Sequence, residues 1–154
     1  KSKKRLNMYR QLENRGLKVV DVNGWDRHRD TLIAKAKILI NIHYDKEYQI
    51  FEHMRCDRWI LSGMLVVSEE SISDDVLDCK DLVISEKYET MIEKILGIIT
   101  NYEEFYPQYL QKLHLQKNSI IRTRRSYCQQ FIKDITGEHG FEEPIVSQNS
   151  SLLV

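Results

Sequence analysis

The stretch "ILINIHYDKEYQIFEHMRCDRWILSGMLVVSE", residues 38–69, decides the fold. It begins and ends with apolar runs that each suit one strand, and a segment of helical length lies between them. Continuous apolar runs, rather than alternating ones, are typical of parallel strands covered on both faces. The stretch therefore predicts a parallel strand, a crossover helix and a second parallel strand.

The same alternation continues on both sides of this stretch. It predicts an α/β, Rossmann-like three-layer sandwich with a mostly parallel sheet and right-handed crossovers. A domain of this kind usually starts with a strand, whereas this chain opens on a helix, so we expect its first strand to be missing or supplied elsewhere. The predicted strands are residues 17–22, 37–43, 64–68 and 81–85, and the predicted helices are residues 3–14, 26–36, 48–62, 73–78 and 88–100.

The sequence changes character after Asn101. Residues 102–116 and 119–137 each have the composition of a further helix, which would pack over the sheet or reach toward another domain. From Gly137 onward the chain has glycines, a proline and polar residues, which favours a tail. We therefore predict one domain over residues 1–136 with C-terminal helices, and a tail over residues 137–154.

Composition argues against several classes of partner. Lys plus Arg and Asp plus Glu each number 23, so no global field favours nucleic acid or an anionic membrane. The basic run at residues 122–126 is short, and we interpret it as a solvated helix face. No segment has the roughly 20 consecutive apolar residues of a membrane span. Cys56, Cys79 and Cys128 are scattered and odd in number, which favours a reducing compartment, and we expect a cytoplasmic protein.

Several common sites are also missing from the sequence. The histidines and cysteines show no metal-ligand spacing, so we expect no metal site. Neither GxxxxGK nor GxGxxG occurs, which argues against P-loop enzymes and ordinary dinucleotide dehydrogenases.

A charged stripe runs along the predicted helix at residues 48–62. Glu52, Arg55 and Arg58 are spaced three apart on a helix that is otherwise apolar around most of its circumference. Buried charges need partners. One interpretation is an ion pair within the helix between Glu52 and Arg55, with Arg58 in solvent.

The other interpretation follows from position. In open α/β sheets, ligands bind beyond the carboxyl ends of strands, where the N-terminus of the next helix favours phosphate. Residues 43–49 occupy that place. Glu52 could then reach a ribose hydroxyl, and Arg55 could order the loop or contact a phosphate. His43 could contact a phosphate or a sugar hydroxyl, or it could be structural.

The order and spacing of these residues resemble a known family. The pattern "ILINIHY…FE..R…..G..VVSE" is similar to the C-terminal nucleotide-sugar-binding domain of GT-B-type glycosyltransferases, especially a bacterial and viral group. The resemblance covers about residues 3–100. Two positions depart from the group: Arg58 stands where it has a second acidic residue, and Leu65 where it has a proline. The matching positions are Lys4, Arg5, Gly16, Gly24, Arg29, Asp30, Leu39, Asn41, Ile42, His43, Tyr44, Glu52, Arg55, Gly63, Val66, Val67, Ser68 and Glu69.

The resemblance implies a function. The chain would be the donor-binding half of a glycosyltransferase that transfers a sugar from a nucleotide diphosphate sugar without a bound metal. It would not be active on its own, because the acceptor-binding domain is absent from this chain. The alternative is a non-catalytic Rossmann-like binding or scaffold module that has lost transferase activity. The expected nucleotide-sugar-binding residues are His43, Tyr44, Glu52, Arg55, Arg58, Ser68 and Glu69.

Overall fold

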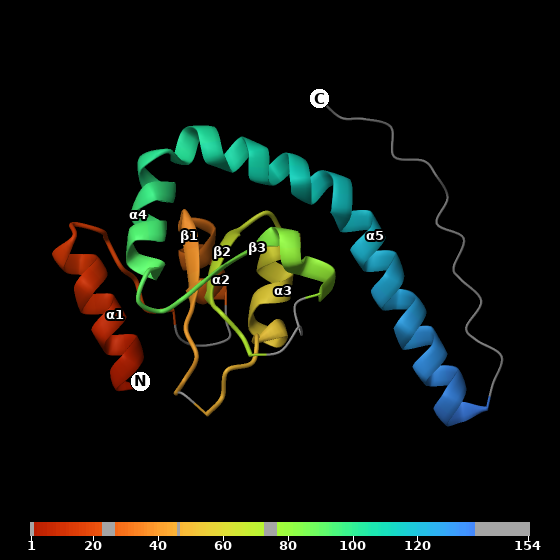
Figure 1. The fold of residues 1–154 in the computed structure, drawn as a ribbon. Helices are drawn as coiled ribbons and strands as arrows, with labels where there is room; N and C mark the ends of the chain where they lie inside the picture. The colour runs from red at the N-terminus through yellow and green to blue at the C-terminus, as the bar shows by residue number, and fades with distance from the viewer. Residues whose placement is uncertain (1, 23–26, 46, 73–76, 138–154) are drawn as a thin grey trace. The chain divides into compact units, whose positions relative to one another are not determined.

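The structure is a computed structural model that describes residues 2–22, 27–45, 47–72 and 77–137. It contains α-helices and a small parallel sheet, which confirms a mixed α/β chain (Figure 1). In chain order the elements are α1 (Lys3–Asn14), α2 (Arg27–Ala34), β1 (Ile38–Asn41), α3 (His53–Leu61), β2 (Leu65–Glu69), the 3₁₀ helix η1 (Leu77–Leu82), β3 (Val83–Glu86), α4 (Met91–Thr100) and α5 (Tyr102–Thr136).

The sheet has the strand order β1-β2-β3, and both strand pairs are parallel. Every residue of the central strand β2 is buried, as its continuous apolar run predicts. The register pairs Asn41 with Ser68 and Ser68 with Ser85. The carboxyl ends of the three strands therefore lie at one edge of the sheet.

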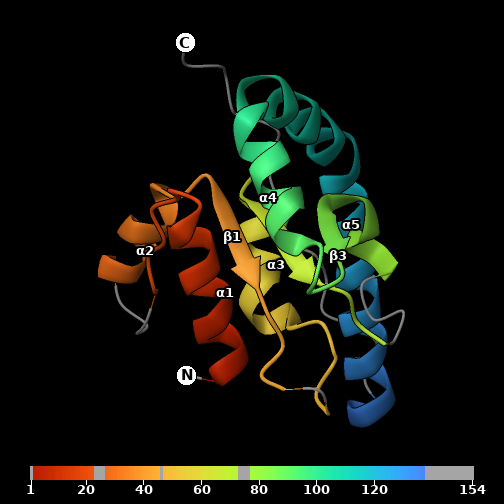
Figure 2. The same ribbon diagram turned by 60° about the vertical axis from the view of Figure 1, so that its left-hand side comes forward.

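Helices cover the central strand of the sheet and complete the core. Both α3 and α4 pack against β2, and α1 packs against α4. Figure 2 shows α3 and α4 beside the sheet. The inward side of α4 consists of Met91, Ile92, Ile95 and Ile98. The largest fully buried apolar side chains are Met8, Leu12, Ile60, Leu65, Val66, Val67, Leu82 and Met91.

The first helix has the bounds that its sequence predicts. Ser2 caps its N-terminus, because the Ser2 hydroxyl accepts a hydrogen bond from the Arg5 backbone N–H at 3.3 Å. Gly16, with φ +80°, follows its C-terminus, where a left-handed residue ends the helix. These signals are local, so the sequence alone was sufficient to place α1.

The prediction of a strand over residues 17–22 is wrong. The Leu17 N–H donates to the Leu12 carbonyl and finishes the turn after α1, and the rest of the segment joins no strand. Its β-branched composition is suitable for a sheet, but a strand needs a neighbour to pair with. The asparagine-glycine turn predicted at residues 23–24 lies outside the described residues.

The helix predicted at residues 48–62 begins later, at His53. The Asp45 side chain accepts hydrogen bonds from the backbone N–H groups of Glu47 and Tyr48, at 2.9 and 3.1 Å, and forms a turn there. The Gln49 carbonyl accepts from the Ile72 N–H at 2.9 Å. In a helix the Gln49 carbonyl would accept from the His53 N–H, so its bond to Ile72 is incompatible with a helix at this point, and Glu52 becomes the N-cap residue of α3.

The two helices predicted after Asn101 form one continuous helix, α5. The chain divides into two units between residues 117 and 118, so this division falls within α5. In the first unit, the Tyr106 and Tyr109 hydroxyls donate to the Gly63 and Met64 carbonyls at 3.0 and 2.9 Å. The predicted tail lies outside the described residues apart from Gly137. No helix in the described residues has both the length and the apolarity to cross a membrane.

Candidate functional site

Polar side chains gather where β1 and β2 end. Asn41, His43, Ser68 and Glu69 are all buried, each with at most 8% of its surface exposed. The Asn41 side-chain amide donates to the Ser68 hydroxyl at 3.1 Å, across the β1–β2 pair. The Ser68 hydroxyl in turn donates to the Glu69 carbonyl at 3.0 Å. This edge of an otherwise apolar sheet is therefore built from hydrogen-bonding groups.

Glu69 links the sheet edge to α1. Its Oε2 atom accepts a hydrogen bond from the His43 backbone N–H at 3.1 Å, and its Oε1 atom forms an ion pair with Lys4. The Tyr88 hydroxyl donates to the Lys4 carbonyl at 2.9 Å, which fixes the backbone that carries this lysine. A carboxylate with so little exposure needs such partners, and here both come from distant parts of the chain.

Glu52 forms the second ionic centre. As the N-cap residue it makes no side-chain cap hydrogen bond; instead its carboxylate meets two arginines. The Arg5 guanidinium lies 3.0 Å from Oε1, and the Arg55 guanidinium lies 2.6 Å from Oε2. Arg5 also donates from Nε to the Ile42 carbonyl at 2.9 Å. Arg5 therefore ties α1 both to the end of β1 and to the start of α3.

Together these contacts join most of the residues predicted for the site. Arg55 completes the connection, because its Nη1 atom lies 3.4 Å from the Asn41 side-chain oxygen. Tyr44 lies beside the group: its ring is 58% exposed and the Arg5 guanidinium is 5.8 Å from the ring centroid. We call the connected residues the edge cluster, which consists of Lys4, Arg5, Asn41, His43, Glu52, Arg55, Ser68 and Glu69.

Arg58 makes its contacts elsewhere. Its Nη2 atom lies 3.1 Å from both carboxylate oxygens of Asp30, which belongs to α2. Its guanidinium carbon is 4.0 Å from the Trp59 ring centroid. The ion pair between Glu52 and Arg55, which one of the two interpretations of the sequence expected, does form. Arg58, which that interpretation left in solvent, pairs with Asp30 and not with the residues of the edge cluster.

Sequence reasoning placed Lys4 and Arg5 only as matches to the family pattern, and did not name them as site residues. Neither did it name Asn41 for the site. The available signal was the pair of basic residues in the first turn of a helix, together with an asparagine that ends an apolar strand. Nothing in the linear sequence shows that α1 folds back to the sheet edge, because Lys4 and Glu69 are 65 residues apart.

Cys56, on the buried side of α3, is unsuitable as a nucleophile. Burial raises the pKa of its thiol to about 12, while the nearby Arg55 guanidinium lowers it and the Glu52 and Asp57 carboxylates raise it further. The thiolate is the reactive form, and it is scarce at neutral pH when the pKa is this high. Among the residues that the structure describes, no group of three or more His, Cys, Asp or Glu side chains could hold a metal ion.

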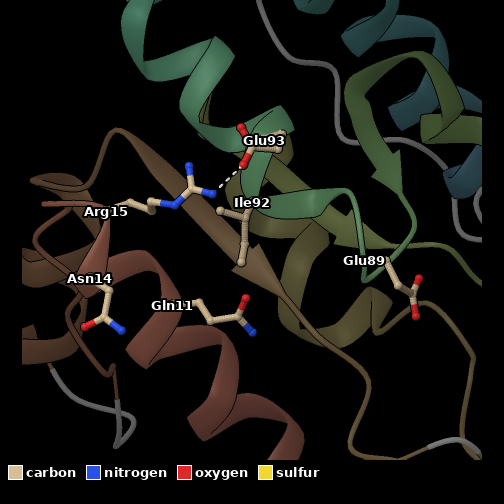
Figure 3. A pocket seen from close by; sticks show the side chains of 6 residues that line it. All are labelled: Gln11, Asn14, Arg15, Glu89, Ile92 and Glu93. Carbon is tan, nitrogen blue, oxygen red and sulfur yellow. Dashed lines mark hydrogen bonds and ion pairs between the residues drawn. The ribbon is translucent and has the colours of Figure 1, made fainter.

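A hollow of about 280 Å³ lies away from the edge cluster, between α1 and α4 (Figure 3). An ion pair of 2.8 Å between Arg15 and Glu93 crosses it. None of the predicted site residues lines this hollow. The lining residues are Gln11, Asn14, Arg15, Glu89, Ile92 and Glu93.

Comparison with known proteins finds relatives in one virus. Three uncharacterized proteins of Acanthamoeba polyphaga mimivirus are 42%, 39% and 35% identical to the chain over 99, 107 and 108 residues. These regions make up 62%, 67% and 68% of this chain, but only 11%, 15% and 36% of the respective relatives. The chain thus corresponds to between 11% and 36% of the length of these relatives. No family model and no solved structure matches the chain.

Proposed function

We propose that the chain is the donor-binding half of a GT-B-type glycosyltransferase, with a Rossmann-like three-layer core. It would transfer a sugar from a nucleotide diphosphate sugar to an acceptor held by a separate domain. The observation that carries the proposal is the edge cluster itself. Side chains from α1, β1, α3 and β2 meet at the carboxyl ends of parallel strands, which is where ligands bind in open α/β sheets.

The charge of the edge cluster is suitable for a diphosphate. Lys4, Arg5 and Arg55 supply three cations against the two carboxylates of Glu52 and Glu69, which leaves one positive charge in excess. Arginine forks and a lysine ammonium are the side chains that bind phosphate oxygens best. The N-terminus of α3 adds the positive end of a helix dipole.

The proposed chemistry uses these cations on the leaving group. The acceptor hydroxyl oxygen attacks the anomeric carbon of the donor sugar, and the bond from that carbon to the diphosphate oxygen breaks. The diphosphate departs with the electron pair, and Lys4, Arg5 and Arg55 stabilise its developing charge. The acceptor proton passes to a base in the acceptor domain, so this chain alone is expected to bind the donor without transferring its sugar. The carboxylates of Glu52 and Glu69 are suited to accept hydrogen bonds from donor hydroxyls.

The second candidate is a binding or scaffold module without catalysis. Two observations favour it: Lys4 and Arg5 already neutralise the carboxylates from within the chain, and Arg58 stands where the resembled family has an acid. In this case the edge cluster is a structural clamp that fixes α1 to the sheet. The two candidates make opposite predictions for ligand binding.

Isothermal titration calorimetry with UDP, GDP, UDP-glucose and GDP-mannose separates these candidates. The transferase proposal expects at least one of the four to bind with a dissociation constant in the micromolar range. It also expects Glu52→Gln to weaken that binding, because Glu52 holds both arginines in place. If a well-folded sample binds none of the four, the transferase proposal is wrong and the scaffold is favoured.

A further inference from the structure

His43 differs from its neighbours in the edge cluster because half of its ring lacks a partner. The side chain is 1% exposed, and its Nε2 atom lies 3.0 Å from the Glu70 carbonyl oxygen. Its Nδ1 atom is shielded from solvent and has no hydrogen-bond partner among the described residues. Buried polar atoms of this kind are rare in native proteins and are often part of a functional site.

The contact with Glu70 fixes the chemistry of the ring. A carbonyl oxygen only accepts, so Nε2 must carry the hydrogen. In the neutral imidazole, Nδ1 then holds a lone pair and no hydrogen, and it can only accept a hydrogen bond. The missing partner of Nδ1 is therefore a donor. Phosphate oxygens, which are acceptors, do not fit this atom.

We infer that His43 Nδ1 accepts a hydrogen bond from a hydroxyl group of the bound ligand, and that His43 therefore recognises the ribose or the sugar and not the diphosphate. This inference rests on the proposed function. It divides the edge cluster into two parts: Lys4, Arg5 and Arg55 meet the phosphates, and His43 meets a hydroxyl.

Because Nδ1 has no solvent-exposed surface, ligand binding requires a neighbouring group to move. Lys4 pairs with the same Glu69 carboxylate that accepts the His43 backbone N–H, and an arriving phosphate competes for its ammonium group.

Nuclear magnetic resonance of the ¹⁵N-labelled wild-type chain tests the ring directly. Two-bond ¹H–¹⁵N correlations should show the hydrogen on Nε2. Saturation with UDP-glucose or GDP-mannose, whichever the chain binds, should shift the Nδ1 resonance and leave Nε2 nearly unchanged. A hydrogen on Nδ1 overturns the inference. So does an Nδ1 resonance that the ligand leaves in place, which would indicate an internal water as its partner.

Two substitutions separate the nitrogen atoms of the ring. Glutamine places its amide near Nε2, so His43→Gln keeps a donor for the Glu70 carbonyl and removes the Nδ1 acceptor. Asparagine places its oxygen near Nδ1, so His43→Asn keeps an acceptor and loses the Glu70 contact. We expect His43→Gln to weaken ligand binding about tenfold, the effect of one lost hydrogen bond, and His43→Asn to weaken it less. The reverse order overturns the inference.

Ligand analogues identify which hydroxyl is bound. If it belongs to ribose, UDP or GDP should bind His43→Gln more weakly than wild type, and the 2′,3′-dideoxy nucleotide should bind both equally. If it belongs to the sugar, His43→Gln should weaken only the nucleotide sugar. When wild type binds no nucleotide, the proposed function and this inference both fail. When His43→Gln binds every ligand as tightly as wild type, only this inference fails.

Discussion

Arg5 and Glu52 are 47 residues apart in the chain, yet the Arg5 guanidinium lies 3.0 Å from the Glu52 carboxylate. Both side chains are less than a third exposed, and Arg5 also donates to the Ile42 carbonyl at 2.9 Å. One side chain thus connects the first helix, the end of β1 and the start of α3. Because β1 is only four residues long, we expect this connection to stabilise the fold as well as the candidate site.

Replacing Arg5 by methionine tests the connection. The substitution keeps an apolar stem of similar length and leaves the Glu52 carboxylate and the Ile42 carbonyl without this donor. We expect the free energy of unfolding, measured by urea denaturation, to fall by about 2 kcal/mol, since hydrogen bonds to charged groups contribute about 1.5–3 kcal/mol each and part of the loss is recovered by solvent.

Arg15→Met is the matched control for this change. Arg15 follows α1 and pairs with Glu93 at 2.8 Å, but these two side chains are 54% and 66% exposed. An exposed ion pair contributes between about 0 and 1 kcal/mol, so Arg15→Met should leave stability nearly unchanged. If Arg5→Met and Arg15→Met lowered the free energy of unfolding equally, the contacts of Arg5 would be no stronger than an exposed ion pair.

Arg55 and Arg58 lie one turn apart on α3 and should affect ligand binding differently. Arg55 contacts Glu52 and Asn41 in the edge cluster, whereas Arg58 pairs with Asp30. Under the proposed function, Arg55→Gln should weaken nucleotide-sugar binding about tenfold or more, as expected for a lost charge-assisted contact, while Arg58→Gln should change it less than about twofold. Calorimetry measures both. A larger effect of Arg58→Gln would assign the family's acidic position a role in binding and would contradict the arrangement proposed here.

The sequence predicts those parts of the fold that depend on local signals. Gly16 marks the end of α1, and the apolar runs at residues 37–43 and 64–68 locate β1 and β2. A glycine with positive φ and a continuous apolar run act within a few residues of where they stand. Such features do not depend on the rest of the chain.

The predictions from the sequence are wrong where distant or competing contacts decide the structure. Residues 17–22 have the composition of a strand, but no strand in the described part of the chain pairs with them. The start of α3 is delayed because the Gln49 carbonyl, which would accept from the His53 N–H in a helix, accepts from the Ile72 N–H instead. For the candidate site, His43, Ser68 and Glu69 could be identified from their places at the ends of two predicted strands, and Glu52 and Arg55 from the predicted helix between them. Lys4 and Arg5 could not, because only the folding of α1 against the sheet brings them there.

Cys56 should make stability depend on pH above about 9. Burial raises the pKa of this thiol from 9.0 to about 12 in the folded chain. Between these values the unfolded chain loses the proton and the folded chain keeps it, so rising pH favours unfolding. Within this window the free energy of unfolding should fall by up to about 1.4 kcal/mol per pH unit, and below it the thiol should cause no pH dependence. Burial also raises the pKa of Tyr109, which adds to the loss above pH 10.

Urea denaturation of the wild type and of Cys56→Ala at pH 8 and pH 10.5 isolates the thiol. Cys56→Ala should be less stable than wild type at pH 8, because it loses buried volume, and the difference should narrow or reverse at pH 10.5. Cys128→Ser, at an exposed cysteine, should follow the wild-type pH dependence. A constant difference between Cys56→Ala and wild type would show that the Cys56 thiol ionises in the folded chain.

Replacing glycine by alanine should change the free energy of unfolding in opposite directions at Gly63 and at Gly97. Gly63 ends α3 with φ +91°, and a Cβ atom there would lie 3.4 Å from Leu110 Cδ2, which is an ordinary contact. The cost of Gly63→Ala is therefore conformational, and we expect the free energy of unfolding to fall by about 1–2 kcal/mol, the cost of a left-handed alanine. Gly97 lies exposed in α4 with no atom near its Cβ position, so Gly97→Ala should stabilise the chain by about 0.5–1 kcal/mol. Urea denaturation measures both. If Gly63→Ala were as stable as wild type, the turn between α3 and β2 would have to adopt another backbone conformation, and the Tyr106 and Tyr109 hydroxyls would lose the carbonyl positions that they now meet.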